Sequence, residues 1–223
     1  MNKNIDYLKE RFKDCFDVKF RELSTILGNG TVVFIDDLCN SQWMMEYMIL
    51  PLRGFGELKG EEGISTPKDL IDKVLDMNMT GIAKDVDDAI FHVLSGDVIL
   101  VLNDYEEIIY SEVKNMVRRG IGIPDTESVL KGPREGFNEL IVDNVALIRR
   151  RLKNPDLKFE AVYVGEKSQT AVAITYIKGI VDENVLEDIR KKVKSLDLRF
   201  VLDSNYIECI FLWKIFKCQM IIM

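Results

Sequence analysis

A stretch rich in glycine, proline and short polar side chains interrupts the chain near its middle. It reads RRGIGIPDTES from Arg118 to Ser128, a composition typical of exposed connecting segments. Patterns of strands and helices lie on both sides of it. We therefore expect an α/β chain of two similar small lobes, each with a mixed sheet flanked by helices. The expected divisions are residues 1–117, a linker at 118–136, an incomplete second lobe at 137–208 and an apolar tail at 209–223.

Composition limits the classes of protein to which the chain can belong. Its 223 residues are 47% hydrophobic and 30% charged, enough to bury a sizeable core. The formal net charge of -7 argues against a nucleic-acid binder, because affinity for phosphate backbones depends on clustered Lys and Arg. We expect no nucleic-acid partner.

Cysteine and histidine spacing predicts no metal site and no cofactor. The four cysteines form no CxxC pair and the single histidine, His92, is distant from all of them in sequence, so zinc-ligand spacing is absent. The cysteine usage fits a reduced cytosolic setting. The first residues, MNKNIDYLKERFKD, lack the apolar core of a secretory signal. The apolar segment 207–223 contains Glu208, Lys214 and Lys217, so we do not expect it to span a membrane.

Apolar periodicity predicts the elements of both lobes. For the first lobe we expect a helix at 4–14, strands at 18–26 and 31–35 around an Asn29-Gly30 turn, helices beginning near Asn40, Pro67 and Lys84, and strands at 98–102 and 108–110. For the second we expect a long helix from Pro133, strands at 158–164 and 170–176, a helix around Val185–Val193 and a strand at 198–202. The recurring hairpin and helix suggest a diffuse internal duplication.

The segment Gly132-Pro133-Arg134-Glu135-Gly136 is a candidate anion site. Backbone N–H groups at a helix N-terminus and the Arg134 guanidinium suit a carboxylate or phosphate. The alternative is a helix-entry turn, in which Pro133 occupies the first helical position and Glu135 accepts hydrogen bonds from terminal N–H groups. Neither a GxxxxGK[ST] loop nor a strand-led GxGxxG accompanies the segment.

Basic residues cluster at the end of the same expected helix: Arg149, Arg150, Arg151 and Lys153. They are candidates for docking on an acidic partner subunit or on anionic lipid. Pairing with the C-terminal end of the helix dipole explains them equally well. Three consecutive arginines point in three directions around a helix, so only part of the cluster can serve one surface.

Residues that would carry catalysis are not arranged for it. Adjacent carboxylates such as Asp36-Asp37 do not face each other in a strand or helix, so we interpret such doublets as caps and turns. His92 lies in an expected helix without a GxSxG elbow anywhere in the chain. We expect no catalytic residues and a chain that is not an enzyme. An enzyme acting on a phosphorylated metabolite is the weakest alternative.

The motif GPREGF, followed by LIRRRLKNPDLKFE, resembles the N-terminal soluble region of the A subunit of GerA-type spore germinant receptors. The similarity extends from about Phe12 to Glu208, after which the family's soluble region continues and a multi-span membrane half follows. The chain therefore resembles a truncated subunit, and we expect it to be marginally stable because an unfinished lobe exposes strand edges.

The resemblance implies a role in nutrient-triggered spore germination, through ligand sensing, subunit assembly or both. It implies B and C subunits as partners, a germinant such as an amino acid or sugar, and a place at the cytosolic side of the spore inner membrane. The truncated chain itself is expected to be soluble. A stand-alone two-lobed binding protein for small molecules is the alternative from another class, and either would place a ligand cleft near Arg134.

Overall fold

The computed structural model describes residues 2–54, 63–75, 77, 79–114, 136–202, 204 and 207. They form two compact units. One contains Met1–Glu10 and Val18–Lys153, and the other contains Arg11–Asp17 and Asn154–Met223, as far as these ranges are described. The α/β class expected from the sequence is confirmed.

The first unit is built on a five-stranded sheet in the order β1-β2-β4-β5-β3, in which all neighbours pair antiparallel. Mixed pairing was expected, so this part of the sequence prediction is wrong. The strands are β1 (Val18–Thr25), β2 (Gly28–Ile35), β3 (Thr80–Ile82), β4 (Asp97–Leu102) and β5 (Ile108–Glu112). Every residue of the central β4 is buried, which is typical of a strand covered on both faces.

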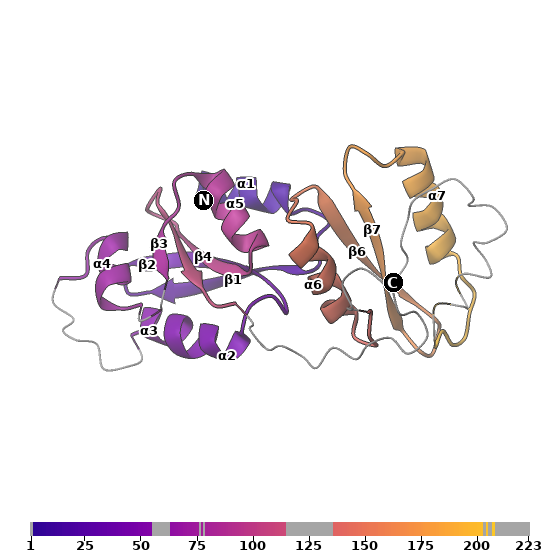
Figure 1. Ribbon diagram of the computed structural model, residues 1–223, viewed down its shortest axis with the longest axis horizontal. Coiled ribbons are helices and arrows are strands. Elements are labelled where there is room, and N and C mark those ends of the chain that lie inside the picture. Colours follow the sequence, from indigo (N-terminus) through magenta and orange to yellow (C-terminus); the bar gives the residue numbers. More distant parts are fainter. Residues whose placement is uncertain are drawn as a thin grey trace, which may run out of the picture. The chain divides into compact units, whose positions relative to one another are not determined.

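Helices cover the two faces of this sheet (Figure 1). Alternate residues of β4 (Val98, Leu100 and Leu102) pack in one core with Met48, Leu52 and Leu70. The helices of that layer are α2 (Ser41–Met44), the π-helical η1 (Met45–Ile49), α3 (Leu50–Leu52) and α4 (Pro67–Lys73). The opposite face contacts α5 (Val86–Leu94). The period of two along each strand thus places one apolar set in each layer.

Two helices begin at N-cap residues close to the positions that the sequence predicts. Asn40 accepts a hydrogen bond from the Trp43 N–H and begins α2. Thr66 and Asp69 form a reciprocal capping box ahead of Pro67 in α4, the pattern that satisfies the first free N–H groups of a helix.

Two local features of the first unit differ from the sequence analysis. The β1–β2 turn consists of Ile26 and Leu27, because Thr25 pairs with Gly28. Gly28 provides the positive φ of 106°, whereas Asn29 and Gly30 lie within β2. The second difference is β3, a strand of only three residues that propensity does not reveal.

The helix expected from Pro133 begins later. α6 runs from Ile141 to Arg151, and residues 136–140 are not helical. The Asn138 side chain accepts the Leu140 N–H at 2.7 Å, and the Asn144 amide bonds the Asn138 main chain on both sides. These local hydrogen bonds compete with a helix over this segment. α6 also packs with the first unit, whereas the sequence analysis assigned it to the second.

The second unit contains a two-stranded antiparallel sheet of β6 (Leu157–Val164) and β7 (Thr170–Ile177). One face is covered by α7 (Glu183–Lys194), whose Leu186, Ile189 and Val193 pack against Val164 and Ile174. Along the outer edge of β6, Cys15 forms a parallel bridge with Phe159. A hairpin followed by a helix thus occurs in both units.

The strand expected at 198–202 is not a strand. Its backbone instead contacts the β6–β7 turn, where Leu198 and Arg199 carbonyls accept hydrogen bonds from the Glu166 and Lys167 N–H groups. Ser168 Oγ also accepts the Val201 N–H. The expected tail at 209–223, and the linker except for Gly136, lie outside the described residues.

Candidate functional site

Most of the candidate anion site lies outside the described residues, including Gly132, Arg134 and Glu135. Gly136 is described and half-buried, but it precedes α6 by several residues instead of opening it. The anion site near Arg134 therefore stays a prediction.

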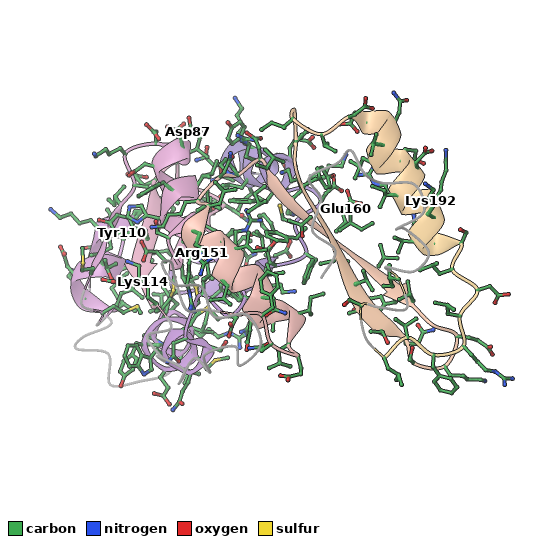
Figure 2. The ribbon with its side chains drawn as sticks, turned by 45° about the vertical axis from the view of Figure 1, so that its right-hand side comes forward. Asp87, Tyr110, Lys114, Arg151, Glu160 and Lys192 are labelled. Carbon is green, nitrogen blue, oxygen red and sulfur yellow. The ribbon has the colours of Figure 1, made fainter. Side chains whose placement is uncertain are left out.

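The basic cluster at the end of α6 divides between the interior and the surface. Arg149 is fully buried, whereas Arg150 and Arg151 are exposed, and Figure 2 marks Arg151 on this helix. Lys153 donates a hydrogen bond to Ser95 Oγ at 3.1 Å and lies over the Phe91 ring, 5.4 Å from its centroid. Arg149 thus lies in the interior and Arg150 and Arg151 lie on the surface, and the docking role of the cluster stays a prediction.

An open, polar depression of about 510 Å³ lies in the first unit, and the sequence analysis did not predict it. α1 (Lys3–Arg11) and the β1–β2 hairpin provide most of its walls. Its lining residues come from positions widely separated in the chain: Asn2, Ile5, Lys9, Glu22, Leu23, Ser24, Asn29, Gly30, Thr31, Arg53 and Asn103. We call it the α1 depression.

Strand register explains the polar floor of the α1 depression. Glu22 pairs with Thr31 and Ser24 pairs with Asn29, so these four side chains lie on one face of the hairpin. Ser24 Oγ donates to Asn29 Oδ1 at 2.8 Å. Gly30 allows β4 to lie close to β2, because a Cβ at this position would lie 2.9 Å from the Val101 carbonyl oxygen.

Charges of both signs face the α1 depression. Lys9, Arg53 and Glu22 are exposed lining residues. Within the described ranges, no ion pair engages any of the three. Cations bind a carboxylate by charge-assisted hydrogen bonds and a carboxylate binds an ammonium group. The depression therefore has the donors and acceptors for a small molecule with charged groups of both signs.

A second charged cluster in the first unit surrounds His92. Its Nδ1 lies 2.7 Å from Asp97 Oδ2, and its ring stacks on Tyr110 with centroids 3.6 Å apart. Lys114 Nζ lies 3.3 Å from Asp97 Oδ1; Figure 2 marks Tyr110 and Lys114. Burial opposes the charged Lys114 amine, but hydrogen bonds to Glu112 and Asp97 outweigh it and raise its pKa. This network joins the ends of α5, β4 and β5.

The main polar network of the second unit joins α7 to the hairpin. Tyr176 Oη donates to Glu160 Oε1 at 2.6 Å, and Arg190 Nε donates to Glu160 Oε2 at 2.9 Å. Burial disfavours the Glu160 carboxylate, but the bonds from Arg190 and Tyr176 outweigh burial and lower its pKa. Burial, followed by the bond to Glu160, raises the pKa of Tyr176. Every charged group has a partner here, so the network suits a structural role.

Across the described residues, no group of three or more His, Cys, Asp or Glu side chains is placed to hold a metal ion. None of the helices formed by those residues combines the length and apolarity needed to cross a membrane.

Comparison with known proteins identifies related chains. Spore germination protein KA of Bacillus subtilis is 28% identical over 92% of this chain, and spore germination protein GerLA of Bacillus cereus is 28% identical over 86%. The uncharacterized membrane protein YfkQ of Bacillus subtilis is 26% identical over 93%. This chain covers only 38%, 39% and 40% of these three proteins, respectively, or about two fifths of their length.

A solved structure confirms the fold. The N-terminal domain of the A subunit of the Bacillus megaterium spore germinant receptor GerK3 matches 97% of this chain and 80% of its own, with a TM-score of 0.68 and 21% identity. The family model described as Bacillus/Clostridium GerA spore germination protein matches residues 6–217, which extends past Glu208, where the sequence analysis ended the similarity. The chain therefore belongs to the GerA family of spore germination proteins.

Proposed function

We propose that this chain is the N-terminal module of a germinant receptor A subunit and takes part in nutrient-triggered spore germination, by ligand sensing, subunit assembly or both. The family match over residues 6–217 is the observation that carries the proposal. The fold of the GerK3 A-subunit domain supports it. The names of the germination relatives describe no enzyme, which supports a non-catalytic role.

The α1 depression is the part of the described chain best suited to ligand sensing. Lys9 and Arg53 suit a carboxylate, and Glu22 suits an ammonium group. The Asn29 and Asn103 amides add neutral donors and acceptors. An amino acid carries both charged groups on a small frame, so we favour an amino acid over a sugar as the germinant that binds here.

Ligand binding can be tested by NMR titration of the isotope-labelled chain with the common amino acids and with glucose. We expect an amino acid to shift the resonances of the lining residues, and Arg53→Gln to weaken that binding about tenfold, the effect of losing one charge-assisted hydrogen bond. Arg21→Gln is the matched control, because Arg21 is an exposed arginine of β1 outside the lining. Shifts absent from the lining residues, or equal losses in both variants, would contradict the site.

Assembly is the second part of the proposal, and Arg150 and Arg151 are its candidate residues. The family-implied partners are the B and C subunits at the spore inner membrane. Exposed arginines at a helix end suit an acidic protein surface. The proposal leaves out Arg149, because its side chain is fully buried.

Copurification with a coexpressed B subunit tests the docking role. We expect Arg150→Glu with Arg151→Glu to abolish copurification, since both positive charges become negative. Lys191→Glu with Lys192→Glu on α7 is the matched control, which reverses two adjacent basic residues elsewhere. Unchanged copurification of the arginine variant would remove the docking role, and an amino acid that still binds would then favour the stand-alone binding protein.

A further inference from the structure

Helix α1 belongs to both compact units. Its residues up to Glu10 count with the first unit, while its last residue, Arg11, counts with the second. The chain then continues through the second unit to Asp17 before it returns to the first at Val18. We call Arg11–Asp17 the strap.

The beginning of α1 is tied to the first unit and forms a wall of the α1 depression. The Asn2 side-chain amide donates to the carbonyl oxygens of Leu102 and Tyr105 at 2.7 and 2.8 Å. Ile5 is buried, and both Ile5 and Lys9 line the depression. A molecule bound there would therefore contact α1 close to the end that enters the second unit.

The strap is held in the second unit by side-chain and main-chain contacts. The Arg11 guanidinium forms an ion pair with Asp156; this hydrogen bond is the main cause that lowers the pKa of Asp156. The buried Lys158 amine donates to the Arg11 carbonyl oxygen at 2.7 Å. Phe159 exchanges main-chain hydrogen bonds with Asp14 and Phe16 at 3.0 and 3.1 Å.

We propose that occupancy of the α1 depression is transmitted into the second unit through α1 and the strap. This inference rests on the proposed ligand sensing, because the bound molecule is the signal that it transmits. A ligand that bridges Lys9 to Arg53 holds the end of α1 on the first unit. Lys9 and Arg11 lie within one helical turn, so the helix carries any displacement directly to the strap. Local opening of the strap would leave β6 in place, because β6 pairs with β7 over its whole length.

The labelling rate of the Cys15 thiol measures how often the strap opens. Cys15 is buried, and its Sγ lies 3.6 Å from the Leu157 carbonyl oxygen, so a thiol reagent reaches it only when the strap opens. The other cysteines are removed by Cys39→Ala, Cys209→Ser and Cys218→Ser, and the labelling rate of Cys15 is measured with a small maleimide. Circular dichroism checks that each variant is folded.

A bulky side chain placed in the α1 depression as a wedge tests the coupling between the depression and the strap without any ligand. Ser24→Trp places an indole in the depression opposite α1, and we expect it to speed Cys15 labelling about fivefold, the lower end of ordinary coupling between sites. Arg21→Trp, on β1 outside the lining, is the control and should leave the rate unchanged. Asn103→Trp, also a lining position, replaces Ser24→Trp if that variant does not fold.

The second arm adds the amino acid that shifts the lining resonances in the NMR titration. It should slow Cys15 labelling about fivefold, because it holds α1 in place. Equal Cys15 labelling rates in Ser24→Trp and Arg21→Trp would overturn the proposed coupling between the α1 depression and the strap. A wedge effect without any slowing by a bound amino acid overturns the transmission of occupancy. If no amino acid binds but the wedge speeds labelling, ligand sensing fails while the link between depression and strap stands.

Discussion

Asp37 combines a left-handed backbone conformation with a partly buried carboxyl group whose pKa is raised. It follows the end of β2 with a φ of 61°, in the left-handed region that glycine, asparagine and aspartate adopt more readily than other residues. Burial raises the pKa of its carboxyl group, and a hydrogen bond with Asp143 raises it further. A raised pKa in the folded protein means that stability falls as pH rises through that pKa.

Asp37→Asn should therefore stabilise the chain at pH 7. The amide accepts the left-handed backbone and is not ionised beside Asp143, so we expect a gain of several tenths of a kcal/mol, limited by solvent screening of a half-buried group. The gain should shrink toward pH 4, where the wild-type carboxyl is increasingly protonated. Urea midpoints at both pH values measure it. Asp36→Asn is the control, and an Asp37→Asn gain that does not change with pH would contradict this account.

At the scale of elements, α7 is attached to its hairpin by Arg190 as well as by apolar packing. Arg190 donates to Glu160 and Tyr176 and lies 5.8 Å from the centre of the Tyr176 ring. The lowered pKa of Glu160 means that its carboxylate stabilises the fold above its ordinary value of 4.5. That contribution is lost as pH falls through the folded pKa.

Arg190→Met should destabilise the second unit by about 1–3 kcal/mol at pH 7, because Glu160 loses its charged partner while it stays partly buried. The difference from wild type should decrease as the pH falls through the lowered pKa of Glu160 in the wild type, because Glu160 then becomes protonated in both proteins. Lys192→Met, on the same helix, is the control (Figure 2). Urea unfolding followed at β6 and α7 resonances measures the effect. A constant difference across this pH range would show that Glu160 is not the group concerned.

The sequence predicted elements well where strong local signals mark them. Thr66 and Asn40 are N-cap residues that mark the starts of their helices, and the apolar runs of β4 and β7 indicate strands. The prediction failed where one side chain redirects the backbone. Asn138 forms hydrogen bonds with residues close to it in the chain, so α6 begins later than expected. The prediction also failed where residues distant in sequence meet. Lys9, Glu22 and Arg53 share the α1 depression only because the sheet brings them together, and no spacing along the chain reveals such a site.

At the scale of the whole molecule, each of the two units contains an apolar core. The core around Leu70 and Leu100 belongs to the first unit, and the core around Leu186 and Ile189 belongs to the second. The units are nevertheless interleaved along the chain, because Arg11–Asp17 belongs to the second and the residues on both sides of it belong to the first.

A core within each unit predicts that each unit can unfold locally. Leu186→Ala should cost about 2–5 kcal/mol, as does the loss of a buried leucine in general, and should speed amide exchange in β6, β7 and α7 while β2 and β4 stay protected. Leu70→Ala is the matched control and should show the opposite pattern. Native-state hydrogen exchange makes the measurement. Uniform acceleration through both units in either variant would indicate one cooperative molecule.

The interleaved path of the chain also governs the order of events at the ribosome. Asp14 and Phe16 are synthesised early, but Phe159, with which they exchange main-chain hydrogen bonds, emerges only after the entire first sheet. Until then their main-chain groups remain hydrated, because their partner strand β6 has not yet been synthesised. A fragment that starts after Asp17 would remove these hydrogen bonds permanently, although it would still contain all of β6, β7 and α7.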